Sequence, residues 1–134
     1  MDEQFVCFSW ANENYAVCLT DVIRILANQQ PFLFQSQKPW LKGVLVYQEK
    51  LVGVVDLAMI NNDCPQYYVV MSDHEDYFAF KANMVWSVVK IPAALWQESS
   101  KAPYRHCLEY EGKMLYLLES GILKDGKWKS DSFN

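Results

Sequence analysis

The stretch from Leu41 to Ile60, LKGVLVYQEKLVGVVDLAMI, most constrains the fold of this chain. It holds two valine-rich apolar runs around a polar tip, Gln48-Glu49-Lys50. β-branched residues favour strands, and a short polar tip between two such runs predicts a β-hairpin. The runs are apolar at successive positions rather than at alternate ones, so we expect strands that are buried on both faces.

Short runs of strand-forming residues recur along the chain, with turn residues between them. A first hairpin is predicted from residues 4–10 and 15–19, further strands at 32–34, 66–72 and 77–91 (as two strands or one bent strand), and a last hairpin from 104–112 and 113–119. Short helices are predicted at residues 21–28, 57–63 and 120–128, the first because Val22, Ile25 and Leu26 recur at helical spacing. This pattern of many short strands predicts a mainly β fold, a barrel or a sandwich.

Composition limits the functions that such a chain can have. The length of 134 residues predicts one domain over 1–134, with residues 125–134 as a frayed tail. The net charge of -4 and scattered Lys and Arg residues argue against a nucleic-acid partner. No apolar run reaches the roughly 18 residues that span a membrane, and the N-terminus lacks the pattern of a signal peptide, so we expect a cytoplasmic protein that is not inserted in a membrane. Reduced thiols are expected there, and a disulfide between Cys7 and Cys18 is disfavoured.

Residues that could carry catalysis are few. His106 and Cys107 are neighbours in a predicted strand, where adjacent side chains point to opposite faces, so we expect no Cys–His pair. The acidic turn at residues 72–76 lacks the ligand pattern of a calcium loop, and the five glycines form no phosphate-binding loop. We therefore predict no catalytic residue, no metal site and no cofactor. Asp56 is expected to cap the turn that follows its strand.

The hairpin resembles the central motif of the CheW-like family, the coupling proteins of bacterial chemosensory arrays. Gly43-Val44 and Val55-Asp56-Leu57 match the start and the close of that motif. Three more segments are similar to other parts of the family pattern in the same order: FVCFSWANENYAVCLTDVIRIL, FAFKANMVWSVVKIP and GKMLYLLESGIL. Together they extend the resemblance over about residues 4–124.

The sequence departs from the family pattern at charged positions. Gln48-Glu49 stands where the family usually has Arg-Gly, Arg24 stands where its helix has Glu, and Gly53 replaces a usual Pro. Because the basic and acidic positions change together, we hypothesise a reversed ion pair between Arg24 and Glu49. At the surface such a pair would act on partner choice more than on stability.

The resemblance implies a fold of two small five-stranded SH3-like β-barrels packed together, with short helices. It implies a non-enzymatic adaptor that couples the cytoplasmic tip of a chemoreceptor to the regulatory domain of the histidine kinase CheA. Carried over by position, the candidate partner-binding residues are Val22, Arg24, Gly43, Val44, Gln48, Glu49, Val85 and Trp86. The altered turn suggests a divergent pathway, such as control of type IV pili and twitching motility.

Two other functions remain open from the sequence. The same barrels could bind a small ligand or an unrelated peptide, with the coupling role lost. An enzyme would have to rely on Cys107 and His106. The five tryptophans could all be core, or some could lie at an interface, where Trp contributes strongly to binding.

Overall fold

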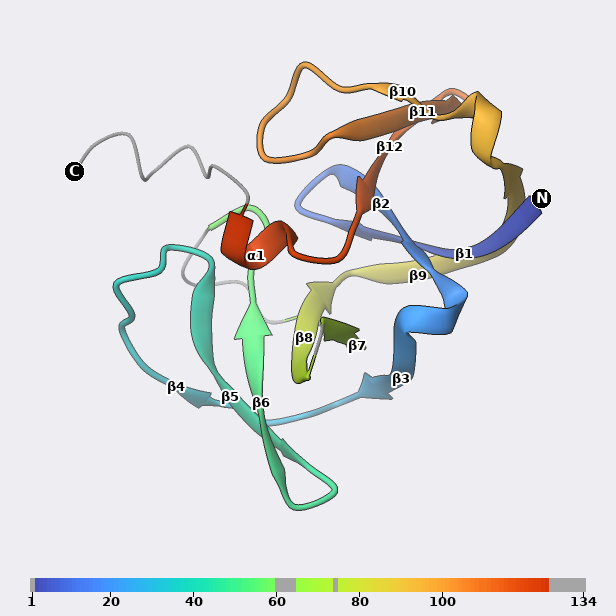
Figure 1. Ribbon diagram of the computed structural model, residues 1–134. Helices are drawn as coiled ribbons and strands as arrows, with labels where there is room; N and C mark the ends of the chain where they lie inside the picture. The colour runs from blue at the N-terminus through green and yellow to red at the C-terminus, as the bar shows by residue number, and fades with distance from the viewer. Residues whose placement is uncertain (1, 60–64, 74, 126–134) are drawn as a thin grey trace.

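The computed structural model describes residues 2–59, 65–73 and 75–125, and most of them lie in β-strands (Figure 1). The strands are β1 Asp2–Trp10, β2 Glu13–Cys18, β3 Val22–Ala27, β4 Phe32–Leu33, β5 Leu41–Tyr47, β6 Lys50–Val55, β7 Tyr67–Asp73, β8 Asp76–Ala82, β9 Met84–Pro92, β10 Gln97–Glu98, β11 His106–Tyr110 and β12 Lys113–Leu118. Two 3-10 turns, Leu19–Asp21 and Ala93–Leu95, and one short helix, α1 Ile122–Asp125, complete the described elements.

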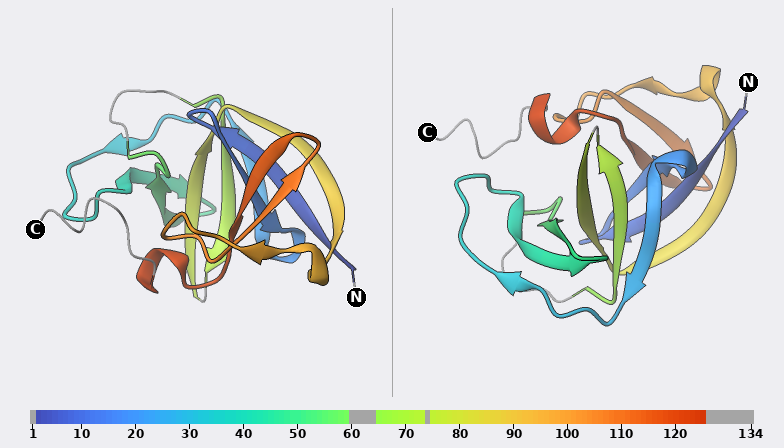
Figure 2. Two further views of the ribbon diagram at one scale, coloured as in Figure 1. Left: turned by 90° about the horizontal axis from the view of Figure 1, so that it is seen from above. Right: turned by 60° about the horizontal axis from the view of Figure 1, so that its bottom comes forward.

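The strands form two six-stranded sheets. Sheet A has the order β10-β11-β12-β2-β1-β9, and sheet B has the order β3-β7-β8-β6-β5-β4. The mainly β prediction is confirmed, but the expected five-stranded closed barrels are not. Each sheet has six strands because it includes a two-residue strand, β10 in sheet A and β4 in sheet B. In the described residues the first and last strands of each sheet are not paired with each other, so neither sheet closes into a barrel (Figure 2).

The helix predicted at residues 21–28 is wrong. Residues 19–21 form a 3-10 turn, and β3 follows, paired antiparallel to β7. Apolar residues at helical spacing were present, but pairing with a distant strand decides the conformation. The helix predicted near the C-terminus is present as α1. The helix expected at 57–63 lies partly outside the described residues, and the tail beyond Asp125 lies wholly outside them. The run at 77–91 is two strands, β8 and β9.

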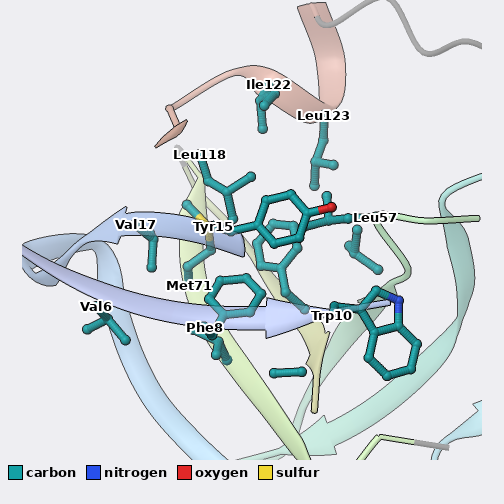
Figure 3. Close-up of a cluster of buried hydrophobic side chains, with 14 of the residues drawn as sticks. Val6, Phe8, Trp10, Tyr15, Val17, Leu57, Met71, Leu118, Ile122 and Leu123 are labelled. Carbon is teal, nitrogen blue, oxygen red and sulfur yellow. The ribbon is translucent and has the colours of Figure 1, made fainter. Parts of the chain in front are cut away.

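The largest core cluster lies where the two sheets pack against each other (Figure 3). It takes Val6 and Phe8 from β1 of sheet A and Val69 and Met71 from β7 of sheet B. We call this cluster the junction core. Of the five tryptophans, Trp10 and Trp40 belong to it, Trp86 and Trp96 are half-buried, and Trp128 lies outside the described residues.

Asp56 connects the two sheets through a buried carboxylate. It is fully buried directly after β6, and its Oδ1 atom accepts a hydrogen bond of 2.8 Å from the indole Nε1 of Trp10 in sheet A. The same Oδ1 accepts the backbone N–H of Ala58 at 2.9 Å, which confirms the predicted role in capping the turn. Lys81 of β8, only 3% exposed, places its Nζ 3.6 Å from Oδ2. A buried carboxylate needs hydrogen bonds and an opposite charge to compensate it. Here Oδ1 accepts the hydrogen bonds, and Oδ2, which accepts none from the described residues, faces the charge of Lys81.

Replacing Asp56 should destabilise the protein strongly. Asp56→Ala removes the acceptor of Trp10 Nε1 and the carboxylate partner of buried Lys81, so we expect a loss of about 3–5 kcal/mol in the free energy of unfolding, measured by urea denaturation. The matched control is Glu13→Ala, which breaks the exposed pair of Glu13 with Lys101 at 3.0 Å and should cost about 1 kcal/mol or less. Equal small losses in the two variants would contradict the role of Asp56.

The stability of the fold depends on the side chains of two buried tyrosines and one buried cysteine remaining protonated. Burial raises the pKa of Tyr15 and of Tyr104, whose hydroxyls share a hydrogen bond. Burial also raises the pKa of the Cys7 thiol from 9.0 to about 11. The folded state therefore holds these three protons at a pH where the unfolded chain has begun to lose them.

Stability should fall in alkaline solution. Below the pKa of the unfolded groups, near 9.0 for Cys and 10.0 for Tyr, their contribution to folding is complete, and it is lost as pH rises further. We expect the free energy of unfolding to decrease steadily from about pH 9 to pH 11. In the Tyr15→Phe, Tyr104→Phe double variant the decrease should be smaller. An unchanged slope in that variant would show that these phenols are not responsible.

Candidate functional site

An apolar patch lies on the outer face of β4, β5 and β6. The strand register places Phe32 opposite Val44 and Val46 opposite Leu51, and Val44 and Val46 share a face because they are two residues apart. Phe32 is 68% exposed, Val46 56% and Leu51 72%, while Val44 is half-buried. We call these four residues the hairpin patch. Figure 1 shows the β5–β6 hairpin projecting away from the rest of the molecule, at the bottom of the view. Exposed apolar side chains grouped in this way are typical of protein-binding surfaces.

Gly43 allows β4 to lie against β5. A Cβ atom at this position would stand 2.3 Å from the carbonyl oxygen of Phe32, closer than any side chain tolerates. Gly43 is buried opposite Leu33. Beside this pair, the backbone N–H of Phe34 donates a hydrogen bond of 3.2 Å to the carbonyl oxygen of Lys42. Gly43 therefore acts through the backbone, by holding Phe32 beside Val44 in the hairpin patch.

Gln48 and Glu49 form the tip of the hairpin in a strained conformation. Their φ angles are +48° and +65°, in the left-handed region that usually belongs to Asn and Gly. The hairpin between β11 and β12 has Glu111 and Gly112 at the same two positions, so the usual Gly is present there. Ala11 and Asn12, between β1 and β2, also have positive φ, so this turn geometry is shared by other hairpins of the chain.

The other predicted site residues lie elsewhere. Val22 of β3 and Val85 of β9 are partly buried against the junction core. Trp86 packs in a separate cluster of sheet A, with its ring centroid 6.4 Å from that of Tyr110 and Lys113 Nζ 4.5 Å above it. Arg24 is exposed on β3. The structure thus groups Gly43, Val44, Gln48 and Glu49 on one hairpin and leaves the remaining four on other strands.

The hypothesised ion pair between Arg24 and Glu49 is not formed. Among the residues that the structure describes, the two side chains make no ion pair with each other. The reason is topological, because β3 is at one end of sheet B and two strands, β7 and β8, separate it from β6.

The sequence analysis did not predict several of the exposed apolar residues. Phe32 and Leu51 belong to the hairpin patch, and Ile25 and Val88 are exposed on β3 and β9, the outermost strands of the two sheets. The sequence showed these residues to be apolar, but a run that is apolar on both faces does not show which face meets water. The expected burial of the hairpin strands on both faces is wrong at Val46 and Leu51.

His106 and Cys107, the residues considered for catalysis, contact different partners. The ring Nδ1 of His106 lies 2.7 Å from Oε1 of Glu119, while the Cys107 thiol points to the backbone carbonyl of Glu98 at 3.9 Å. Cys7, Cys18 and Cys107 are free thiols, and Cys18 is opposite Phe5 in the strand register while Cys7 is opposite Ala16. In the acidic turn at 72–76, Asp73 is buried and accepts the Gly121 backbone N–H at 2.8 Å.

Comparison with known proteins agrees with this architecture. The sequence profile of the CheW-like domain matches residues 4–123. The chain belongs to the CheW-like domain family. A search of curated protein sequences gives no match. The fold is similar to the crystal structure of scaffolding protein TtCheW from Thermoanaerobacter tengcongensis, with a TM-score of 0.77 and 15% sequence identity over 92% of this chain and 88% of that chain.

The structure shows where two parts of the CheW-like sequence pattern lie. Its Val-Asp-Leu close contains Asp56, the residue that joins the two sheets, and Val55 and Leu57 on either side belong to the junction core. Its turn is the projecting tip, where this CheW-like chain has Gln48 and Glu49. Along the described residues, no helix is long and apolar enough to cross a membrane.

Gly43→Ala should release β4 from the hairpin patch. The added methyl group cannot fit beside the Phe32 carbonyl, so we expect the short edge strand to detach at a cost of about 1–2 kcal/mol. Hydrogen exchange at the Phe34 amide should become about tenfold faster. Gly53→Ala is the control, because its new Cβ would meet only side-chain atoms of Leu41 and Phe78, at 3.1 and 3.2 Å. If Phe34 remains as protected as in the wild type, Gly43 does not have this role.

Proposed function

We propose that this protein is a non-enzymatic chemosensory adaptor that couples a receptor to a CheA-type histidine kinase. Membership of the CheW-like family over residues 4–123 supports the proposal. The single observation that carries it in this chain is the hairpin patch, a group of exposed apolar side chains on a projecting, regularly paired hairpin. Exposed Phe and Leu side chains gain free energy when a partner covers them, so a group of them favours a protein-binding surface.

The kinase regulatory domain is the partner that we assign to the hairpin patch. The face is formed by strands and has Gln48 and Glu49 at its tip for polar contacts. Interfaces with an apolar centre and a polar rim suit the packing of one β-domain on another. The charge of Glu49, where the family usually has Gly, would then influence which kinase is accepted.

The chemoreceptor tip is the partner that we assign to the outer strands β3 and β9. Val22 and Val85 lie half-buried at the edge of the junction core, and Ile25 and Val88 add exposed apolar surface on the same two strands. An amphipathic helix binds where apolar side chains of this kind line a surface. Arg24 would offer a charged contact beside them.

We place this coupling in the cytoplasm of a bacterium and in a divergent pathway, such as control of type IV pili and twitching motility. The support for a divergent pathway is the altered turn, Gln48-Glu49 in place of Arg-Gly. A flagellar pathway would be favoured instead if the protein bound only the kinase encoded with flagellar genes.

Binding to a kinase domain tests the proposal. Isothermal titration calorimetry with the regulatory domains of the CheA-type kinases from the same genome should give micromolar or tighter binding to at least one of them. The Val46→Asp, Leu51→Asp double variant should bind at least about tenfold more weakly, because each carboxylate would be buried without a partner at the interface.

The control variant is Met114→Asp, which changes an exposed apolar residue on β12 of sheet A. Its affinity should equal that of the wild type. Failure of the wild type to bind any of these domains would contradict the adaptor function. Binding that is weakened by Met114→Asp and not by the hairpin variant would keep the function but move the interface to sheet A.

A further inference from the structure

A cavity of about 390 Å³ opens at one end of sheet A. Its walls come from distant parts of the sequence: β1, the 3-10 turns at Leu19–Asp21 and Ala93–Leu95, and the strands β11 and β12. Phe5, Ile91 and Leu118 give it a buried apolar floor. Cavities that bind small molecules usually have volumes of about 300–1,000 Å³, an apolar lining and a few polar groups. This cavity has those properties and shares no residue with the hairpin patch.

An aromatic wall stands beside the floor. The ring of Trp96 contacts that of Phe5 edge to face, with 5.3 Å between centroids and 64° between planes. The indole Nε1 of Trp96 is buried and has no hydrogen-bond acceptor within the described part of the chain. This N–H is a donor, so Trp96 contributes apolar surface to the cavity, and the preference for charge comes from the other polar groups.

The polar groups around the cavity are mainly carboxylates. Glu3, Asp21 and Glu119 line it, and its described lining contains no Lys or Arg. Burial raises the pKa of Asp21, and the negative charges of Asp73 and Glu3 raise it further. The part of the shift that Asp73 and Glu3 cause has the sign of neighbouring negative charges, in agreement with a lining that holds three carboxylates.

Two contacts modify this charge without removing it. The Cys18 thiol donates a hydrogen bond of 3.3 Å to Oε2 of Glu3, and a neutral thiol adds no positive charge. His106 Nδ1 contacts only Glu119 among the three carboxylates, at 2.7 Å. Cations are therefore attracted to the cavity and anions are repelled.

We propose that the cavity binds a small organic cation, an ammonium group carried on an apolar or aromatic body. The ammonium group would lie among Glu3, Asp21 and Glu119, and the apolar body would cover the floor beside the ring of Trp96. A metal ion is not the ligand that we assign, because the described residues include no group of three or more His, Cys, Asp or Glu placed to hold one. This site goes beyond the adaptor function, which does not require a ligand.

Three probes with one body and different charges test the proposal on the full chain. They are 2-phenylethylamine, 2-phenylethanol and phenylacetate, and binding is followed by amide shifts in two-dimensional NMR spectra. We expect the amine to bind at least about tenfold more tightly than the alcohol, and phenylacetate to cause no shifts. The shifted amides should cluster at residues 3–5, 18–21, 91–96 and 117–120. Equal binding of amine and alcohol, shifts confined to other residues, or no shifts with the amine at about 10 mM would overturn the proposal.

Variants at the rim separate a charge effect from a folding effect. The Glu3→Gln, Glu119→Gln double variant keeps the size of both side chains and should weaken amine binding about tenfold while leaving binding of the alcohol unchanged. Glu109→Gln on β11 is the matched control, since Glu109 is exposed and does not line the cavity. It should bind the amine like the wild type. If both variants lose the same affinity, the effect is one of overall charge, and the assigned site is wrong.

Discussion

The carboxylate of Asp56 is the interaction on which the rest of this structure depends. It accepts the indole N–H of Trp10 from sheet A, caps the turn after β6 through Ala58, and lies beside buried Lys81 of β8. A buried charge must be matched by donors and by an opposite charge, and the two sheets supply them together. Val55 and Leu57, on either side of Asp56, belong to the junction core.

The two sheets present different surfaces. Sheet B carries the hairpin patch, where strand pairing and Gly43 hold apolar side chains in water, and we propose a protein partner for it. Sheet A carries the cavity, where carboxylates surround an apolar floor, and we propose a small cation for it. A ligand in sheet A and a protein on sheet B would then be joined through the junction core. This arrangement agrees with an adaptor, whose function is to hold partners at fixed positions without chemistry.

Sequence reasoning predicted the parts of the fold that local patterns determine. The hairpins followed from strand-forming runs and turn residues, and the family resemblance located Asp56 and the Gln48-Glu49 tip. It failed for β3, because Val22, Ile25 and Leu26 satisfy a helical spacing while pairing with β7 is decided far along the chain. It also failed for the Arg24–Glu49 pair, since relative positions across a sheet depend on strand order. Glu3 and Glu119, from opposite ends of the sequence, line the same cavity, and no local pattern predicts that arrangement.

Hydrogen–deuterium exchange of the protein, alone and saturated with the kinase domain that it binds, tests the central claim most directly. The account predicts that binding slows exchange in β4, β5 and β6, around the hairpin patch, and leaves the strands next to the cavity, β11 and β12, unchanged. Protection confined to sheet A, with the β5–β6 hairpin exchanging as fast as in the free protein, would contradict it.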